Sequence, residues 1–466
     1  MAKNRKNKSP LDSKIYRHRR RIRSVILSYI AAIIILAIIG AGLFFVVKTG
    51  SKMLADKKAE LQAEQEAMEA EALAVQESIE AAEAERIAEL EARTARELEE
   101  AESTETETET EEYSEKDVLD EVVDTYISTM SLEEKVAGLF IITPEALTSN
   151  NKVIKAGDGT KEALEKYPVG GLVYFSQNIQ SGDQIKEMLG NTVSFSKYPL
   201  FLCVKEEPGD GSQMRKTLKL DSMDSAAKIG ESGDSNNAYE AYKSMGEYLV
   251  EYGFNVDLSL VADIQVDGVE SKLGDRVFGS DVTNVSNMID GAIRGLNESG
   301  ISACITHFPG QGTADADPAK GLATSDRSSD DFLQNDIAVF NAGIEAGADM
   351  VMVGNFIAPA LTGDEATPCT LSKAVMTDLL RGEYQYDGVI ITDELSMPAI
   401  KDYYGSGEAA VKALKSGADM LLMPENFEEA YKAVVDAVND GTISEQRIND
   451  SLARVYRIKY RSTVED

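Results

Sequence analysis

The histidines of this chain restrict the chemistry that it can perform. Beyond residue 24 it has one histidine, His307, in the segment THFPGQG (306–312), and the other, His18, lies among basic N-terminal residues. A zinc site built on several imidazoles is therefore excluded, as is a second histidine that could serve as base for another nucleophile. We expect no metal site, and carboxylates must carry most of the acid–base chemistry if the chain is an enzyme.

The residues that directly follow several short apolar segments are mostly polar and could form one site. They are Lys205-Glu206-Glu207, Asp263, His307, Asn355, Asp393-Glu394 and Pro424. Several carboxylates with one histidine and one asparagine favour a site that binds a polyol and works through carboxylates. No glycine-rich loop opens a helix in the phosphate-binding or dinucleotide-binding pattern, which argues against a phosphate or flavin site.

The apolar segments are typical of buried strands and alternate with amphipathic helical patterns. The expected strands are 139–142, 171–175, 200–204, 255–260, 302–306, 350–353, 389–392 and 420–423. The helical patterns include 238–251, 285–298, 331–346, 408–415 and 444–460. Eight such units predict an α/β fold, a parallel (β/α)8 TIM barrel rather than a doubly wound sheet. In this fold the carboxyl ends of the strands form the rim that carries the chemistry.

A transmembrane helix is expected ahead of the barrel. Residues 25–47 are almost wholly apolar and, at roughly 1.5 Å per residue, reach across a hydrocarbon core of about 30 Å. Residues 1–24 form a basic tail, which the positive-inside rule places in the cytoplasm with the barrel outside. A cleaved signal peptide is the alternative, but the apolar run is too long and no small-residue cleavage site follows it. We therefore expect a single-pass protein of the cell membrane, held in the lipid bilayer by residues 25–47.

Between membrane and barrel the sequence predicts a stalk and a linker. Residues 48–102 are rich in alanine and glutamate and favour a helix. Apolar residues recur every seventh position from Leu54 to Val75, but companion positions such as Lys58 are polar. The stalk is therefore either a solvated helix or a coiled coil that self-associates weakly. Residues 103–113 form an acidic linker, and residues 114–466 form the barrel.

The net charge limits the partners that the chain can bind, and the cysteine count indicates the state of its thiols. The formal net charge of −33 would repel nucleic acids, so we expect no nucleic-acid partner. The three cysteines Cys203, Cys304 and Cys369 are odd in number, and the first two lie in strand-like runs. They are expected to be buried free thiols rather than a disulfide framework.

Five motifs in order along residues 130–459 together resemble glycoside hydrolase family 3, in its single-barrel β-N-acetylglucosaminidase branch. They are MSLEEK (130–135), GGLVYF (170–175), GDRVFG (274–279), HFPGQG (307–312) and YDGVIITDELSM (386–397). The resemblance implies an exo-acting, retaining β-glycosidase that acts on β-N-acetylglucosaminides, including cell-wall fragments. Such hydrolysis needs no metal or cofactor, and its partner is a carbohydrate.

The resemblance also assigns roles to individual residues. Asp393 matches the catalytic nucleophile, although an aspartate there could instead cap the following helix. His307 matches a sugar-binding histidine, and Arg276 resembles an arginine that contacts the glycone; the alternatives are a loop-satisfied histidine and a solvated charge. Asp263 either binds sugar or braces loops. The other expected sugar contacts are Glu206, Glu207, Asn355 and Met397.

Three positions depart from the family pattern. Thr306 replaces a lysine before the histidine, and Lys205 stands where an aspartate grips two sugar hydroxyls. In the segment TADADPAK (313–320), Asp317 matches an aspartate of the family, but Ala319 stands where the general acid/base histidine is expected. Either Asp315 or Asp317 protonates the leaving group, or Glu206, Glu207 or Glu394 does so from across the rim. Alternatively, the protein is a weakened enzyme or a non-catalytic, glycan-binding scaffold.

Overall fold

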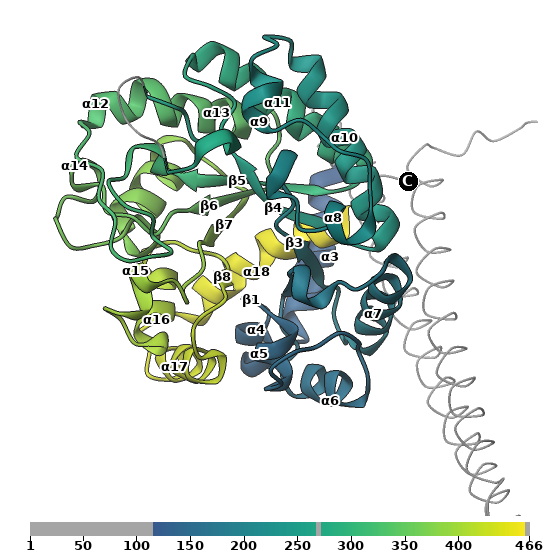
Figure 1. The fold of residues 1–466 in the computed structure, drawn as a ribbon. Coiled ribbons are helices and arrows are strands. Elements are labelled where there is room, and N and C mark those ends of the chain that lie inside the picture. Colours follow the sequence, from purple (N-terminus) through teal and green to yellow (C-terminus); the bar gives the residue numbers. More distant parts are fainter. Residues whose placement is uncertain (1–114, 267–271, 462–466) are drawn as a thin grey trace, which may run out of the picture. The chain divides into compact units, whose positions relative to one another are not determined.

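Eight short parallel strands form the centre of the molecule in the computed structural model, which describes residues 115–266 and 272–461. Their order is β7-β6-β5-β4-β3-β2-β1-β8, and a bridge between Ile391 and Met420 joins β7 to β8. Helices surround the strands (Figure 1), so the predicted (β/α)8 barrel is confirmed. The strands are β1 Phe140–Ile142, β2 Gly171–Tyr174, β3 Phe201–Val204, β4 Val256–Val261, β5 Ser302–Phe308, β6 Met350–Val353, β7 Val389–Thr392 and β8 Leu421–Leu422.

The helices of the described chain differ widely in length. The α-helices are α3 Glu115–Ser128, α4 Leu132–Ala137, α5 Pro144–Thr148, α6 Asp158–Lys166, α7 Gly182–Phe195, α8 Arg215–Leu218, α9 Ala226–Gly230, α10 Ser235–Tyr252, α11 Val282–Ser299, α12 Ser329–Asp331, α13 Ile337–Glu345, α14 Pro359–Thr362, α15 Pro398–Lys401, α16 Ser406–Ser416, α17 Phe427–Asn439 and α18 Glu445–Tyr460. Short 3₁₀ helices are η1 Ser176–Asn178, η2 Gly209–Gly211, η3 Gly274–Arg276, η4 Gln311–Thr313 and η6 Cys369–Leu371. Two π-helices are η5 Phe332–Asp336 and η7 Ala374–Glu383.

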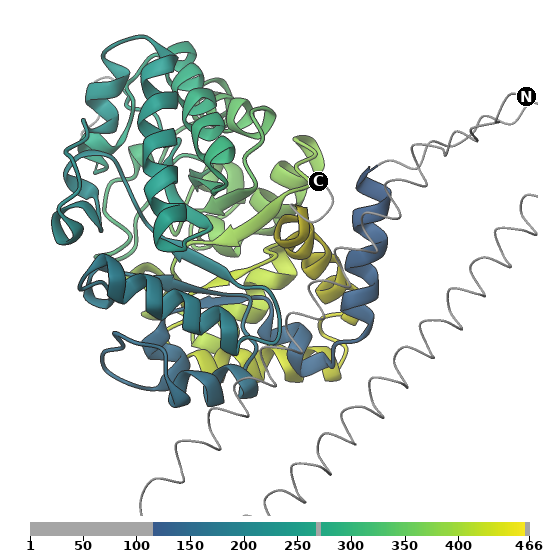
Figure 2. The same ribbon diagram turned by 90° about the vertical axis from the view of Figure 1, so that its right-hand side faces the viewer.

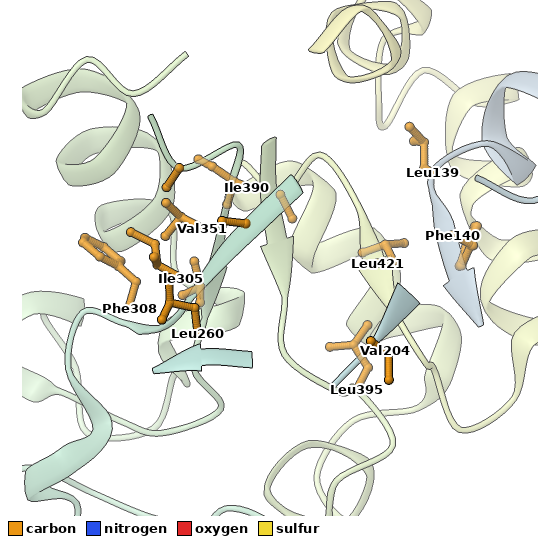
Figure 3. Packing of buried hydrophobic residues seen from close by; sticks show 14 of the residues in the cluster. Leu139, Phe140, Val204, Leu260, Ile305, Phe308, Val351, Ile390, Leu395 and Leu421 are labelled. Carbon is orange, nitrogen blue, oxygen red and sulfur yellow. The ribbon is translucent and has the colours of Figure 1, made fainter. Parts of the chain in front are cut away.

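Two apolar layers hold the barrel together, because successive side chains of a strand point to opposite faces. One layer lies between strands and helices and includes Leu260, Ile305, Val351 and Ile390 (Figure 3). The other fills the interior and includes Val173, Cys203, Val256, Cys304, Met352 and Ile391. All three cysteines of the sequence are buried and free, as predicted.

Helix α18 closes the amino end of the barrel. Its Val455 joins the interior layer, and Lys459 Nζ donates a 2.7 Å hydrogen bond to Gly170 O, just before β2. Helix α3 lies along α18 (Figure 2), where the Tyr126 and Tyr460 rings stack with centroids 4.9 Å apart. The opposite end, formed by the carboxyl ends of the strands, is left to the connecting loops.

Several sequence predictions meet a different outcome or remain untested. Strand β5 continues past the predicted end at 306 to Phe308, which pairs with Val353 of β6. The helix predicted over 331–346 is interrupted, because η5 separates α12 from α13. The predicted tail (1–24), transmembrane helix (25–47), stalk (48–102) and linker (103–113) lie outside the described residues. Within 115–266 and 272–461, no helix has the length and apolar character needed to cross a membrane.

Candidate active site

Asp393 lies directly after β7, and its side chain is almost fully buried, with the residue 1% exposed. Its backbone N–H donates to Val353 O of β6 at 3.0 Å, which fixes the end of β7 against the neighbouring strand. One carboxylate oxygen, Oδ1, accepts a 2.8 Å hydrogen bond from the Glu394 N–H. The second oxygen carries no hydrogen bond among the described residues and remains available to a ligand.

Lys205, which follows β3, lies next to this carboxylate. Its Nζ is 3.8 Å from Asp393 Oδ1 and donates a 2.6 Å hydrogen bond to Glu394 Oε1. Burial alone would lower the pKa of the Lys205 ammonium, but the charges of Glu394 and Asp393 outweigh it and raise the pKa above its usual value. The sequence placed Lys205 at a strand end, but its contact with the carboxylates of the seventh strand was not predicted.

Asp263 and His307 form a closely bonded pair at the ends of β4 and β5. Asp263 Oδ2 accepts hydrogen bonds from the His307 N–H at 3.0 Å and from His307 Nδ1 at 2.8 Å. Asp263 Oδ1 accepts from the N–H groups of Gln311 at 2.5 Å and Gly312 at 3.1 Å. Because Nδ1 faces a carboxylate, Nε2 is the histidine nitrogen left for a ligand.

Of the two roles predicted for Asp263, these four hydrogen bonds favour bracing the loop over contact with sugar. Both of its oxygens are occupied, so the residue orients the imidazole and holds the following turn. The turn requires glycine at two positions. Gly310 has a φ of 126°, and a Cβ on Gly312 would come within 2.8 Å of Ile264 O. Asp263 therefore braces the loop, which was the alternative interpretation of its position.

Glu206 and Glu207 lie on opposite sides of the chain that leaves β3. Glu207 forms a bidentate ion pair with Arg276, with Nε and Nη2 each 2.7 Å from a carboxylate oxygen. Glu206 is fully buried and accepts hydrogen bonds from the N–H groups of Gln213 at 2.8 Å and Met214 at 3.1 Å, from Tyr248 Oη at 2.6 Å and from the Ser212 hydroxyl. This burial and these four internal hydrogen bonds disfavour the predicted role of Glu206 as a sugar contact or proton donor.

The loop after β5 carries the two candidate proton donors. Asp315 is exposed, and its Oδ1 accepts a 2.8 Å hydrogen bond from the Thr324 N–H. Asp317 accepts from the Ala319 N–H at 3.0 Å and lies 3.4 Å from Lys320 Nζ, with its side chain 37% exposed. Pro318 O accepts a 3.2 Å hydrogen bond from the Ala399 N–H of α15. This contact holds the loop beside the segment that follows Asp393.

Two remaining predicted contacts flank the Asp393 segment. Asn355, after β6, is fully buried; its Nδ2 donates to Glu394 O at 2.8 Å, and its Oδ1 has no partner among the described residues. Met397 caps α15 and is partly exposed. No group of three or more histidine, cysteine, aspartate or glutamate side chains in the described chain could hold a metal ion. The rim thus combines the carboxylates of Asp393 and Glu394, each with one oxygen free of hydrogen bonds among the described residues, with the Lys205 ammonium, the Arg276 guanidinium and one imidazole nitrogen.

Comparisons with known proteins cover this barrel. The family model for the glycosyl hydrolase family 3 N terminal domain matches residues 131–458. The β-hexosaminidase LpqI of Mycobacterium tuberculosis is 30% identical over 271 residues, which are 56% of this chain and 68% of the relative. The β-hexosaminidase A of Pseudoalteromonas piscicida is 26% identical over 64% of this chain, and the match spans only 54% of that longer protein.

Solved structures agree with the sequence matches. A glycoside hydrolase family 3 β-N-acetylglucosaminidase from Paenibacillus superposes with a TM-score of 0.66 and 30% identity, over 72% of this chain and 64% of that one. The structure of M. tuberculosis LpqI gives a TM-score of 0.64 and 26% identity, over 72% of this chain and 96% of that one.

Proposed function

This chain belongs to glycosyl hydrolase family 3, and we propose that it is an exo-acting β-glycosidase that hydrolyses β-N-acetylglucosaminides. The observation that carries the proposal is the buried Asp393 at the end of β7, with one carboxylate oxygen left for a ligand. The β-hexosaminidase relatives support this substrate class.

The proposed reaction is a two-step displacement that retains the anomeric configuration. Asp393 attacks the anomeric carbon, the bond to the leaving oxygen breaks, and that oxygen takes a proton; water then hydrolyses the glycosyl ester. We assign the proton donor to Asp317, because the adjacent Pro318 contacts α15 beside the Asp393 segment. Because Asp317 stands in for the missing histidine from a partly exposed loop position, we expect slow cleavage of unactivated leaving groups.

Two observations favour a second candidate function, a glycan-binding protein that does not cleave its ligand. The position expected to hold the acid/base histidine is Ala319, which is exposed and has no proton to donate. Lys205 places a positive charge 3.8 Å from Asp393, where an oxocarbenium-like transition state would itself be positive. Either feature would lower the rate of glycoside hydrolysis, and both together would leave glycan binding as the main activity.

Trapping of the nucleophile distinguishes the two functions. A fluorinated N-acetylglucosaminyl fluoride slows both steps but keeps a good leaving group, so a retaining enzyme accumulates its glycosyl ester. We expect mass spectrometry to find the label on Asp393, together with slow release of an aryl leaving group. The matched control is Asp402→Asn, which alters an exposed carboxylate of the same loop and should keep both signals, whereas Asp393→Asn loses both. Binding of N-acetylglucosamine without labelling or turnover would favour the scaffold.

We further propose that the barrel is anchored to the cell membrane by residues 25–47 and acts outside the cytoplasm near the cell wall. The support is the apolar character of this segment and the excess of basic residues before it. Weak self-association through residues 48–102 belongs to the same proposal.

A further inference from the structure

Most acceptor groups at the rim are already engaged within the protein. Asp263 accepts four hydrogen bonds, and Glu207 is held on both oxygens by Arg276. Glu394 accepts from Lys205 through Oε1. Besides one oxygen of Asp393, only Glu394 Oε2 and the buried Asn355 Oδ1 of this set lack a hydrogen bond among the described residues, so few acceptors are left for the hydroxyl groups of a neutral sugar.

The cationic groups have unused donors instead. Lys205 makes one hydrogen bond among the described residues, so two of the three N–H bonds of its ammonium remain for a ligand. Arg276 uses Nε and Nη2, which leaves Nη1 with two N–H bonds. Their side chains are 18% and 35% exposed, so a ligand can reach both.

The charges of Lys205 and Arg276 act on each other. The charge of Arg276 lowers the pKa of Lys205 to a small extent, within the larger effects of burial and of Glu394, so the two groups interact through space. Burial is the largest effect on the pKa of Arg276 and would lower it, but Glu207 above all, followed by Asp263 and Asp393, raises it. Geometry agrees, because Lys205 Nζ lies 3.8 Å from Asp393 Oδ1 and Arg276 is paired with Glu207, only two residues after Lys205.

We propose that this rim recognises a sugar that carries an anionic oxyacid group, namely a carboxylate, a sulfate or a phosphate, bound by Lys205 and Arg276. The inference rests on the proposed sugar site and specifies its substrate class. An oxyanion accepts hydrogen bonds without donating any, which matches an ammonium and a guanidinium that have donors to spare. Lys205 replaces the aspartate expected to grip hydroxyls, so an acceptor has become a donor and the preferred ligand group changes accordingly.

The proposal also gives Lys205 a place in turnover. Positive charge develops at the anomeric carbon in the transition state, close to the Lys205 ammonium, which lies 3.8 Å from Asp393 and is paired with Glu394. An anionic group bound at Lys205 adds negative charge there and stabilises the transition state. A neutral glycoside adds no such charge, so it should be both the weaker ligand and the poorer substrate.

Calorimetric titration of the full-length protein in detergent tests the proposal first on its own binding preference. The ligands are N-acetylglucosamine, N-acetylmuramic acid, glucuronic acid, and the 6-sulfate and 6-phosphate of N-acetylglucosamine, which separate carboxylate from sulfate and phosphate. We expect one anionic ligand to bind at least tenfold more tightly than N-acetylglucosamine at low salt. Equal or weaker binding of every anionic ligand, or no measurable binding of any, overturns the proposal.

Variants then assign the preference to Lys205. Lys205→Met keeps most of the side-chain volume without the charge and should reduce the anionic preference to about threefold or less, while Lys205→Gln tests the same loss with a polar side chain. The control Lys216→Met alters an exposed lysine of the following segment and should keep the preference. A preference that survives both Lys205 variants, with melting temperatures unchanged, also overturns the proposal.

Hydrolysis is measured separately from binding, so that failure of this inference can be told from failure of the proposed enzyme activity. Tight binding of an anionic sugar without turnover upholds this inference and counts against the proposed enzyme. Turnover of neutral and anionic aryl glycosides at equal kcat/KM, with no binding preference, supports the enzyme and rejects the inference.

Discussion

Four residues decide what this rim can do. Asp393 and His307 keep the roles of a nucleophile and a sugar contact within reach, since each has one atom free for a ligand. Lys205 and Ala319 disfavour hydrolysis. Lys205 adds a positive charge beside Asp393, and Ala319 leaves the expected acid/base position without a proton donor. The rate of hydrolysis by a glycosidase with these four residues should depend strongly on how readily the leaving group departs without being protonated.

Restoring the missing imidazole tests that dependence. Ala319 is exposed and its N–H bonds Asp317, so a histidine introduced there has room and a carboxylate beside it. We expect Ala319→His to raise kcat/KM at least tenfold for a methyl β-N-acetylglucosaminide, within the roughly 10²–10⁴-fold range of general acid catalysis. An activated aryl glycoside should gain much less, because its leaving group needs little protonation.

The control for this gain is Lys320→His, which places the same imidazole one residue away on an exposed side chain. It should leave both rates unchanged. An equal rise for the methyl and aryl substrates in Ala319→His would contradict the assignment of this position to proton transfer.

At the scale of the elements, the sequence could predict the eight strands but only part of the structure of the loops after them. Apolar β-rich runs are a strong local signal, and each predicted run overlaps an observed strand, although β4 and β5 extend past their predicted ends. Which way a side chain turns after the strand is a tertiary effect. Lys205 and Glu207 engage rim partners while Glu206 turns to Tyr248 of α10, an alternation that residue types alone do not reveal. The π-helix η7 was likewise missed because it has no distinct sequence signal.

The interface between β4 and α10 should make stability depend on pH. Asp257 of β4 is fully buried, and burial, together with Glu206 and Glu207, raises its pKa to about 8. The folded state therefore keeps a proton that the unfolded chain loses near pH 4, so this residue's contribution to stability falls as pH rises from about 4 to 8. Its Oδ2 has no partner among the described residues, in keeping with a neutral carboxyl.

Asp257→Asn removes this titration while nearly keeping the shape of the side chain. Urea unfolding at pH 5, 6.5 and 8 should show the variant gaining stability relative to the parent protein as pH rises, by on the order of 3 kcal/mol across the range. Asp378→Asn, at an exposed carboxylate, should show no such trend. A stability difference that is the same at all three pH values would show that Asp257 is ionised in the folded protein.

At the scale of the molecule, the described chain joins the preceding sequence at α3, beside the helix that closes the amino end of the barrel. Val123 and Ile127 of α3 are buried, Tyr126 stacks on Tyr460, and Asp120 accepts a 3.2 Å hydrogen bond from Arg457 Nη2. The candidate site lies at the other end, among the carboxyl ends of the strands. Helix α3 therefore belongs to the barrel by packing, although it precedes the first strand.

Two truncations test where anchor and barrel divide. The chain 114–466 keeps α3, so it should be soluble and retain the melting temperature and sugar binding of the full protein, while the full protein stays in the membrane fraction until detergent is added. The chain 129–466 loses the burial of Val123 and Ile127, worth roughly 1.5–3 kcal/mol each, and should melt about 5–10 °C lower. A full-length protein found in the soluble fraction would refute the anchor. Equal melting temperatures of the two truncated chains would show that α3 adds nothing to the stability of the barrel and belongs to the segment that connects it to the membrane.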